Sequence, residues 1–114
     1  MQNKDSNYII YKICCNDLKL SKYFYIGYTQ NFRQCTYWHK KNCININNKT
    51  RNNKLYNIIR AYGGWDNWRM AIIKEYKNIS HIEAQIKTEN CRMNIHEELF
   101  IENLINENEN ENII

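Results

Sequence analysis

Five residues within the first 40 positions carry chemically active groups or let the backbone approach a ligand closely. They provide two hydroxyls, an imidazole, a thiol and an unsubstituted backbone position: Tyr11, Tyr25, His39, Cys35 and Gly27. Phosphodiester hydrolysis needs a weak base that activates water, a cation for the phosphate oxygens and a carboxylate that holds a divalent metal ion. Glycine lets the backbone approach a phosphate closely, and a protonated His39 would add partial positive charge.

The tyrosines and the glycine fall in two segments rich in aromatic and β-branched residues, 8–13 and 23–28. This composition predicts two strands. The polar connection between the segments predicts that the strands form an antiparallel hairpin. Core packing in a half-buried hairpin is the alternative role of both tyrosines.

Cys35 and His39 fall in a predicted helix that runs to about residue 41. Either Thr29 or Asn31 suits its N-cap. Residues four apart share a helix face, so Cys35 and His39 should lie together. The pair could also form a thiol nucleophile or a metal site, although no third ligand is evident.

A second helix is predicted over residues 54–62, after a polar loop at 42–53, and Gly63 with Gly64 should end it. Its spacing places four apolar side chains in one stripe: Leu55, Ile58, Ile59 and Tyr62. A third strand is expected over residues 68–76.

Ser80 should cap a long third helix whose inward side chains are Ile82, Ile86, Met93, Leu99 and Phe100. The predicted order of elements is β-β-α-α-β-α. We therefore expect a small α/β fold of the α+β type, in which helices flank a three-stranded antiparallel sheet. Residues 1–104 should form a single domain, and residues 105–114 an acidic low-complexity tail.

The composition is that of a small folded domain inside a cell. The chain has 114 residues, of which 43% are hydrophobic and 25% charged, and this excludes a disordered chain. No apolar run approaches the ~20 residues that cross a bilayer, and the N-terminus lacks the layout of a secretion signal. We expect an intracellular protein, cytoplasmic or nuclear, without a membrane partner.

The five cysteines are odd in number and form no Cys-x-x-Cys motif. This favours reduced thiols, with a structural zinc site as the alternative.

Charge is divided unevenly along the chain. Residues 1–74 hold 13 Lys or Arg against 3 Asp, whereas residues 75–114 hold 3 Lys or Arg against 9 Glu. A basic body attracts polyanions such as nucleic acid. Ordinary solvated surface charge is the alternative.

These features together resemble the GIY-YIG nuclease family, in particular its members from large DNA viruses. Tyr25-Ile26-Gly27 matches the second signature of the family, and Ile9-Ile10-Tyr11 matches the first with its glycine replaced. The downstream pattern continues through Thr29, Asn31, Phe32, position 35 and His39. Residues 57–68 resemble the helix-turn-strand passage of the viral members, so the resemblance covers about residues 7–92.

The resemblance implies an endonuclease that cleaves DNA with a single Mg²⁺ or Mn²⁺ ion. It implies that Tyr11 and Tyr25 line the site and help to activate water, and that Gly27 leaves room for the phosphate. Family members usually carry a separate DNA-recognition module, so sequence specificity should be low unless a separate protein or domain supplies it. The oligomeric state stays open.

Two positions that carry charged residues in the family depart from its pattern in this chain. Cys35 takes the place of the family's arginine, and Arg33 cannot replace it because two residues turn a helix by about 200°. The family's metal-binding glutamate falls in register on Thr88. We favour its neighbour Glu89 as the metal ligand and keep Glu97 as the alternative. Either glutamate could instead lie on a solvated helix face.

Basic side chains of the loop and second helix could contact the DNA backbone: Lys40, Lys41, Lys49, Arg51, Lys54 and Arg60. Three aromatic residues could stack on unpaired bases, although packing roles are the alternative: Tyr37, Trp38 and Trp65. Two rival functions remain. A catalytically degenerate domain would bind DNA without cutting it. A protein-interaction module would use the acidic third helix and tail, and would expose a large apolar patch.

Overall fold

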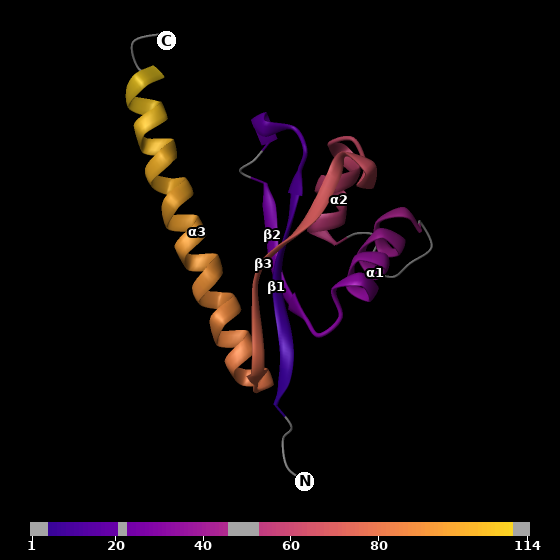
Figure 1. The fold of residues 1–114 in the computed structure, drawn as a ribbon. Coiled ribbons are helices and arrows are strands. Elements are labelled where there is room, and N and C mark those ends of the chain that lie inside the picture. The colour runs from indigo at the N-terminus through magenta and orange to yellow at the C-terminus, as the bar shows by residue number, and fades with distance from the viewer. Residues whose placement is uncertain (1–4, 21–22, 46–52, 111–114) are drawn as a thin grey trace.

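The computed structural model describes residues 5–20, 23–45 and 53–110, with side chains up to residue 95 (Figure 1). The elements of these residues are β1 (Ser6–Cys15), η1 (Leu18–Leu20), β2 (Phe24–Thr29), α1 (Phe32–Ile44), α2 (Lys54–Ala61), η2 (Trp65–Asn67), β3 (Trp68–Ile79) and α3 (His81–Asn110). The two η elements are short 3₁₀ helices. The predicted order β-β-α-α-β-α is confirmed, while β1 and β3 extend beyond their predicted ends.

The strands form one antiparallel sheet in the order β2-β1-β3. β1 and β2 make the predicted hairpin, and their register pairs Tyr11 with Gly27. On the other side of β1, Tyr11 lies opposite Ile72, and a register shift beside it leaves Ile73 as a bulge. Tyr11 therefore lies on the central strand, with a paired strand on each side.

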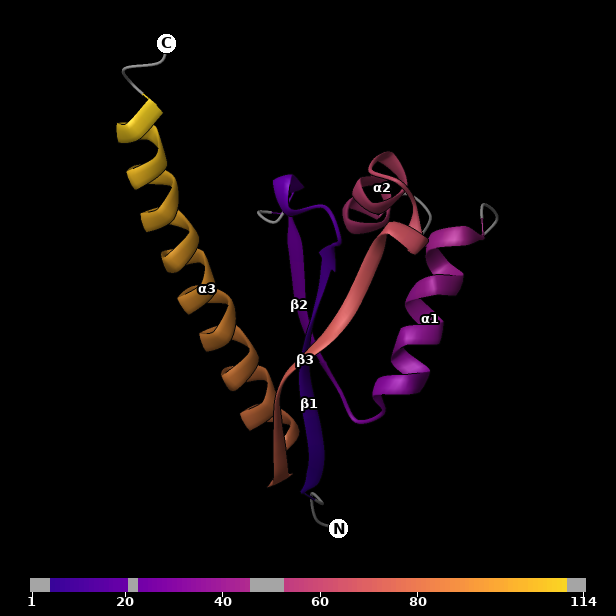
Figure 2. The ribbon, with the colours of Figure 1, turned by 45° about the horizontal axis from the view of Figure 1, so that its top comes forward.

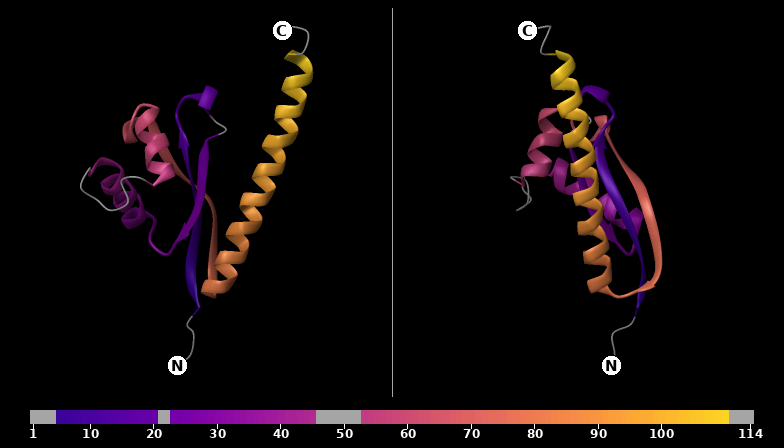
Figure 3. Two further views of the ribbon diagram at one scale, coloured as in Figure 1. Left: turned by 180° about the vertical axis from the view of Figure 1, so that it is seen from behind. Right: turned by 90° about the vertical axis from the view of Figure 1, so that its left-hand side faces the viewer.

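The helices divide between the two faces of the sheet. α1 and α2 lie over one face, and α3 crosses the other (Figure 1, Figure 2). Views from behind and from the side show the same layers, with α3 extending past the end of the sheet (Figure 3). The larger core lies under α1 and α2 and includes the fully buried Ile13 and Ile59. The smaller core, Tyr8, Ile79 and Ala84, lies at the start of α3.

Side chains cap the starts of α1 and α3. The carboxamide of Asn31 accepts the N–H of Gln34 at 3.0 Å, so Asn31 rather than Thr29 is the N-cap of α1. The hydroxyl of Ser80 accepts the N–H of Glu83 at 3.0 Å, as predicted for the third helix.

The end of α2 follows its prediction. Gly63 and Gly64 have φ of +96° and +78°, a conformation that glycine adopts without strain, and the N–H of Gly64 donates to the Ile59 carbonyl at 2.9 Å. The apolar stripe holds at three of its four positions. Ile59 is buried, and Leu55 and Ile58 pack half-buried against the core, whereas Tyr62 is 39% exposed.

The prediction for the inward face of α3 was wrong. Ile82, Ile86 and Met93 are 65%, 55% and 57% exposed, and Ala84 and Thr88 are buried in their place. The sheet face under α3 carries large side chains, so close approach of the helix requires small residues on its inner side. Leu99 and Phe100 lie beyond the side chains that the structure describes. Among the described residues, none of the helices is long and apolar enough to cross a membrane.

Candidate active site and nucleic-acid interface

A line of hydrogen bonds runs between β1 and the two helices that cover it. The thiol of Cys35 donates to Tyr11 Oη at 3.4 Å, and Tyr11 Oη lies 2.8 Å from His39 Nε2. On the other side of the ring, His39 Nδ1 lies 2.8 Å from Tyr56 Oη. If each proton serves one hydrogen bond, the three bonds run in one direction. Cys35 donates to Tyr11, Tyr11 donates to His39 Nε2, and His39 Nδ1 donates to Tyr56. We call these four residues the Tyr–His cluster.

Burial sets the protonation states of the cluster. Tyr11 and His39 are only 3% and 5% exposed. Burial lowers the pKa of the His39 imidazole to about 4, so the ring is neutral near pH 7 and does not carry the partial positive charge that the sequence led us to expect. The neutral ring can accept a proton. Burial, with a further contribution from the hydrogen bond of Cys35, raises the pKa of the Tyr11 hydroxyl far above its usual value. Tyr11 therefore stays protonated and can act only by passing a proton on.

The space beside Gly27 is filled by Tyr11. A Cβ at residue 27 would lie 2.7 Å from Tyr11 Oη and 2.9 Å from Tyr25 Cε2, which is too close for either contact. The ring centroid of Tyr25 lies 6.3 Å from that of Tyr11 and 6.1 Å from that of His39. Gly27 thus makes room for a tyrosine, whereas we expected it to make room for a phosphate.

α3 brings one cation to β2. Arg92 donates from Nη2 and Nε to the carbonyl of Ile26 at 2.7 and 3.1 Å. Its Cζ lies 6.0 Å from the ring centroid of Tyr25, and its Nη1 lies 3.2 Å from Oε2 of Glu89. A guanidinium therefore reaches the strand that carries Tyr25 and Gly27, and the carboxylate of Glu89 pairs with that guanidinium.

The candidate metal ligands differ in their surroundings. Thr88, where the family register expects glutamate, is buried, and its hydroxyl donates to the Ala84 carbonyl at 2.6 Å. Glu89 is exposed beside it. Glu97 lies in α3 but outside the residues whose side chains are described.

No group of three or more His, Cys, Asp or Glu is placed to hold a metal ion within the described part of the chain, and all five cysteines are free. A zinc site needs such a group. Mg²⁺ instead keeps several waters and takes one or two carboxylates together with substrate phosphate. The exposed carboxylate of Glu89 fits that smaller requirement.

The layer of α1 and α2 is cationic. Between Asp17 and Asp66 the chain has nine Lys or Arg and no Asp or Glu. Of the predicted DNA contacts, three side chains are exposed on this layer: Lys40, Lys41 and Lys54.

The other basic candidates are placed differently. Arg60 is held within the fold, because it donates to the Cys43 carbonyl at 2.7 Å and to Asn57 Oδ1 at 2.8 Å. Lys49 and Arg51 lie outside the described residues.

The three aromatic candidates for base stacking also differ in their exposure to solvent. Tyr37 and Trp38 are exposed on α1, whereas Trp65 is half-buried and packs against the core.

Comparisons of the chain with protein-family models, with curated proteins and with solved structures gave no match. The resemblance to the GIY-YIG nucleases therefore rests on the sequence motifs, and the geometry of the Tyr–His cluster is a separate observation.

Two residues of the site were missed from the sequence. Tyr56 bonds His39 from another helix, and the only signal was a tyrosine one turn before Ile59 on an apolar helix face. Arg92 had no local signal beyond its i,i+3 spacing from Glu89, because its contacts with β2 depend on where α3 crosses the sheet.

Proposed function

We propose that the chain is a GIY-YIG-like endonuclease domain that hydrolyses DNA phosphodiester bonds with a divalent metal ion. The observation that carries the proposal is the 2.8 Å contact between Tyr11 Oη and His39 Nε2. The two residues are 28 positions apart and come from different elements, and the family motifs had singled out both. A buried neutral imidazole bonded to a hydroxyl is a proton acceptor already in position.

The proton would move in one direction through the cluster. Water attacks phosphorus, and its O–H bond breaks as the proton passes to Tyr11 Oη. Tyr11 passes its own proton to His39 Nε2, and Tyr56 holds the imidazolium that forms. The bond from phosphorus to the leaving oxygen breaks, and that oxygen keeps the electron pair and takes a proton from solvent.

Arg92 and Glu89 supply the charged groups. Arg92, beside Tyr25, would meet the phosphate oxygens in the role that the thiol of Cys35 cannot fill. Glu89 would hold the metal ion, which neutralises phosphate charge when bound. The ion pair between the two side chains must open for both roles. Both are substantially exposed, and opening such a pair costs about 0–1 kcal/mol.

Cleavage of supercoiled plasmid in Mg²⁺ or Mn²⁺ tests the proposal. We expect the native protein to nick the plasmid, and His39→Gln to slow nicking by about 10²–10⁴-fold, the range for loss of a general base. His81→Gln is the matched control, because His81 is an exposed histidine on α3 outside the cluster. If His39→Gln and the native protein nick the plasmid at the same rate, the proposed base is wrong.

A domain that binds DNA without cleaving it is the second candidate, and positions 35 and 88 favour it. Cys35 places a thiol where a cation is expected, and Thr88 is 1% exposed, which leaves no place there for a carboxylate. Absence of cleavage by the native protein, together with cleavage by Cys35→Arg, would establish that the native domain is catalytically degenerate. Cys35→Arg is the sharper variant, because Thr88→Glu would bury an unpaired charge.

A further inference from the structure

We propose that the outer face of α1 binds two consecutive unpaired bases of single-stranded DNA beside the Tyr–His cluster. The inference rests on the proposed function, since it takes DNA as the ligand. It goes further by naming the form of DNA that the site would select, namely a segment whose bases are not paired.

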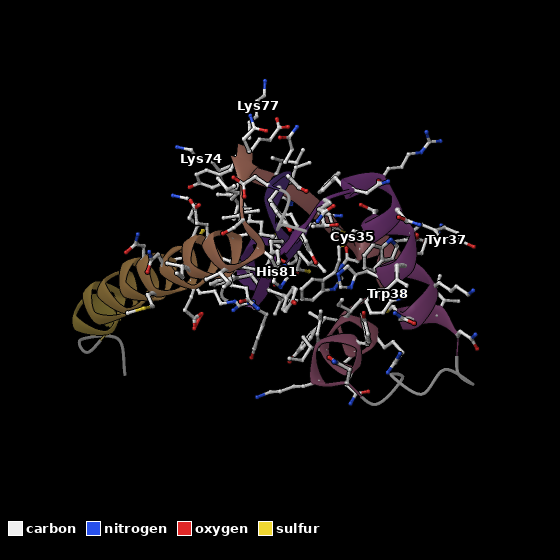
Figure 4. All side chains as sticks on the ribbon, turned by 90° about the horizontal axis from the view of Figure 1, so that it is seen from below. Cys35, Tyr37, Trp38, Lys74, Lys77 and His81 are labelled. Carbon is white, nitrogen blue, oxygen red and sulfur yellow. The ribbon has the colours of Figure 1, made fainter. Side chains whose placement is uncertain are left out.

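The first observation is a pair of neighbouring aromatic side chains in water. Tyr37 is 66% and Trp38 52% exposed, whereas Trp68 is 5% exposed. Figure 4 shows Tyr37 and Cys35 on opposite sides of α1, with Cys35 toward the sheet. The ring of Trp38 meets that of His39 edge-on, with 5.2 Å between centroids. Adjacent exposed aromatic residues are typical of binding surfaces.

The second observation is a pair of adjoining hollows. One has a volume of about 270 Å³ and is lined by Thr29, Asn31, Gln34, Cys35 and Trp38. The other has a volume of about 400 Å³ and is lined by Asn31, Arg33, Gln34 and Tyr37. The hollows share Asn31 and Gln34, and each has one exposed aromatic ring in its wall.

Helix geometry explains this arrangement. Residues three and four apart are surface neighbours, so Tyr37 and Trp38 flank Gln34. They differ by about 100° around the axis, so each ring serves its own hollow. Among the residues that the structure describes, the side-chain amide of Gln34 makes no hydrogen bond, nor does the guanidinium of Arg33. One base can lie on each ring, with the amide between them and Arg33 near the backbone phosphate.

The surrounding charge favours a nucleic acid over a protein ligand. α1 carries Arg33, Lys40 and Lys41 and no carboxylate. Stacking on an aromatic side chain requires the open face of a base, which an intact duplex covers. The hollow beside Trp38 ends at Cys35, whose thiol donates to Tyr11. A base in this hollow would place its neighbouring phosphate next to the Tyr–His cluster.

Fluorescence anisotropy with a labelled oligonucleotide of about ten thymidines tests the proposal on the full chain. We expect Trp38→Ala to weaken binding by about 5-fold to 150-fold and Trp38→Phe by less, because a stacked base is worth about 1–3 kcal/mol. Tyr37→Ala should also weaken binding. That loss of affinity cannot be ascribed to misfolding, because the Tyr37 side chain is 66% exposed. Ile44→Ala is the matched control, since Ile44 is an exposed apolar residue of the same helix.

An abasic oligonucleotide of the same length separates bases from phosphates. The native protein should bind the abasic oligonucleotide at least about 5-fold more weakly than the thymidine oligonucleotide. Trp38→Ala and the native protein should bind the abasic oligonucleotide with equal affinity. Lys40→Gln should flatten the salt dependence of binding, whereas Trp38→Ala should leave it unchanged. Equal affinity for the two oligonucleotides, or for Trp38→Ala and the native protein, would overturn the proposal.

Binding and nicking measured on the same protein samples distinguish the failure of this proposal from the failure of the proposed function. Base-dependent binding without plasmid nicking would leave the base sites standing and remove the nuclease. Nicking that depends on His39, combined with equal affinity for the two oligonucleotides, would support the nuclease and remove the base sites.

Discussion

The two helical layers of the molecule differ in charge, in packing and in what they leave exposed. The layer of α1 and α2 lies in a stretch without carboxylates, covers the larger core and encloses the Tyr–His cluster. α3 carries seven of the nine glutamates, covers the smaller core and leaves an apolar stripe in water. One sheet thus supports two surfaces with opposite physical properties.

This difference indicates where a polyanion would bind. A surface without carboxylates attracts DNA, and an acidic helix repels it. DNA is therefore expected on the α1–α2 side, and the proposed contribution of α3 is limited to Arg92 beside Tyr25 and the metal ligand Glu89. The following variants test this division of roles.

The largest expected effect contrasts an isoleucine of each layer. Ile59, under α2, is fully buried, so Ile59→Ala should lower the free energy of unfolding by about 2–5 kcal/mol. Ile86, on the outer side of α3, is 55% exposed, so Ile86→Ala should change it by no more than about 0.5 kcal/mol. Urea unfolding of both variants measures the contrast. A large loss in Ile86→Ala would mean that the outer face of α3 is covered in solution.

The next effect is a dependence on pH in the α1–α2 layer. The pKa of histidine in an unfolded chain is about 6.5, and burial lowers that of His39 to about 4. Between these values the unfolded chain binds a proton that the folded chain does not. The free energy of unfolding should therefore fall as the pH is lowered from about 6.5 to about 4, by about 3 kcal/mol in total.

Unfolding by urea at several pH values, in the native protein and in His39→Gln, isolates this contribution. Ile86→Ala serves as the control because it keeps every titrating group. If His39→Gln loses stability as steeply as the native protein over this range, His39 does not titrate as described.

The smallest effects concern the attachment of α3. Arg92→Gln removes two hydrogen bonds to the Ile26 carbonyl and should lower the free energy of unfolding by about 1–2 kcal/mol. Glu89→Gln removes only an exposed ion pair and should cost about 0–1 kcal/mol, less at high salt. Thermal unfolding at low and high salt ranks the two variants. A larger loss in Glu89→Gln would reverse the roles assigned to them.

The elements of the fold were predictable because their signals are local. Aromatic and β-branched runs predicted the strands, Ser80 predicted a helix start, and Gly63-Gly64 predicted a helix end. The contact between Tyr11, Cys35 and His39 was foreseeable in part, because four-residue spacing places Cys35 and His39 on one helix face.

The inner face of α3 was not predictable in this way. Apolar periodicity selects residues by hydrophobicity, whereas the distance between helix and sheet depends on side-chain size. Ala84 and Thr88 are buried because they are small, and Ile86 stays outside. The positions of Tyr56 and Arg92 depend on how whole elements cross one another, and no short stretch of sequence encodes that.

The bulge in β3 has a consequence for how the molecule behaves at high concentration. β3 is a twelve-residue edge strand with partly exposed Ile72 and Ile73, the kind of edge that templates aggregation between molecules. The bulge at Ile73 interrupts the regular row of backbone donors and acceptors. Exposed charges follow it at Lys74, Glu75 and Lys77. A strand from a second molecule would meet a broken register and charged side chains, so the sheet is protected from adding a fourth strand at its β3 edge.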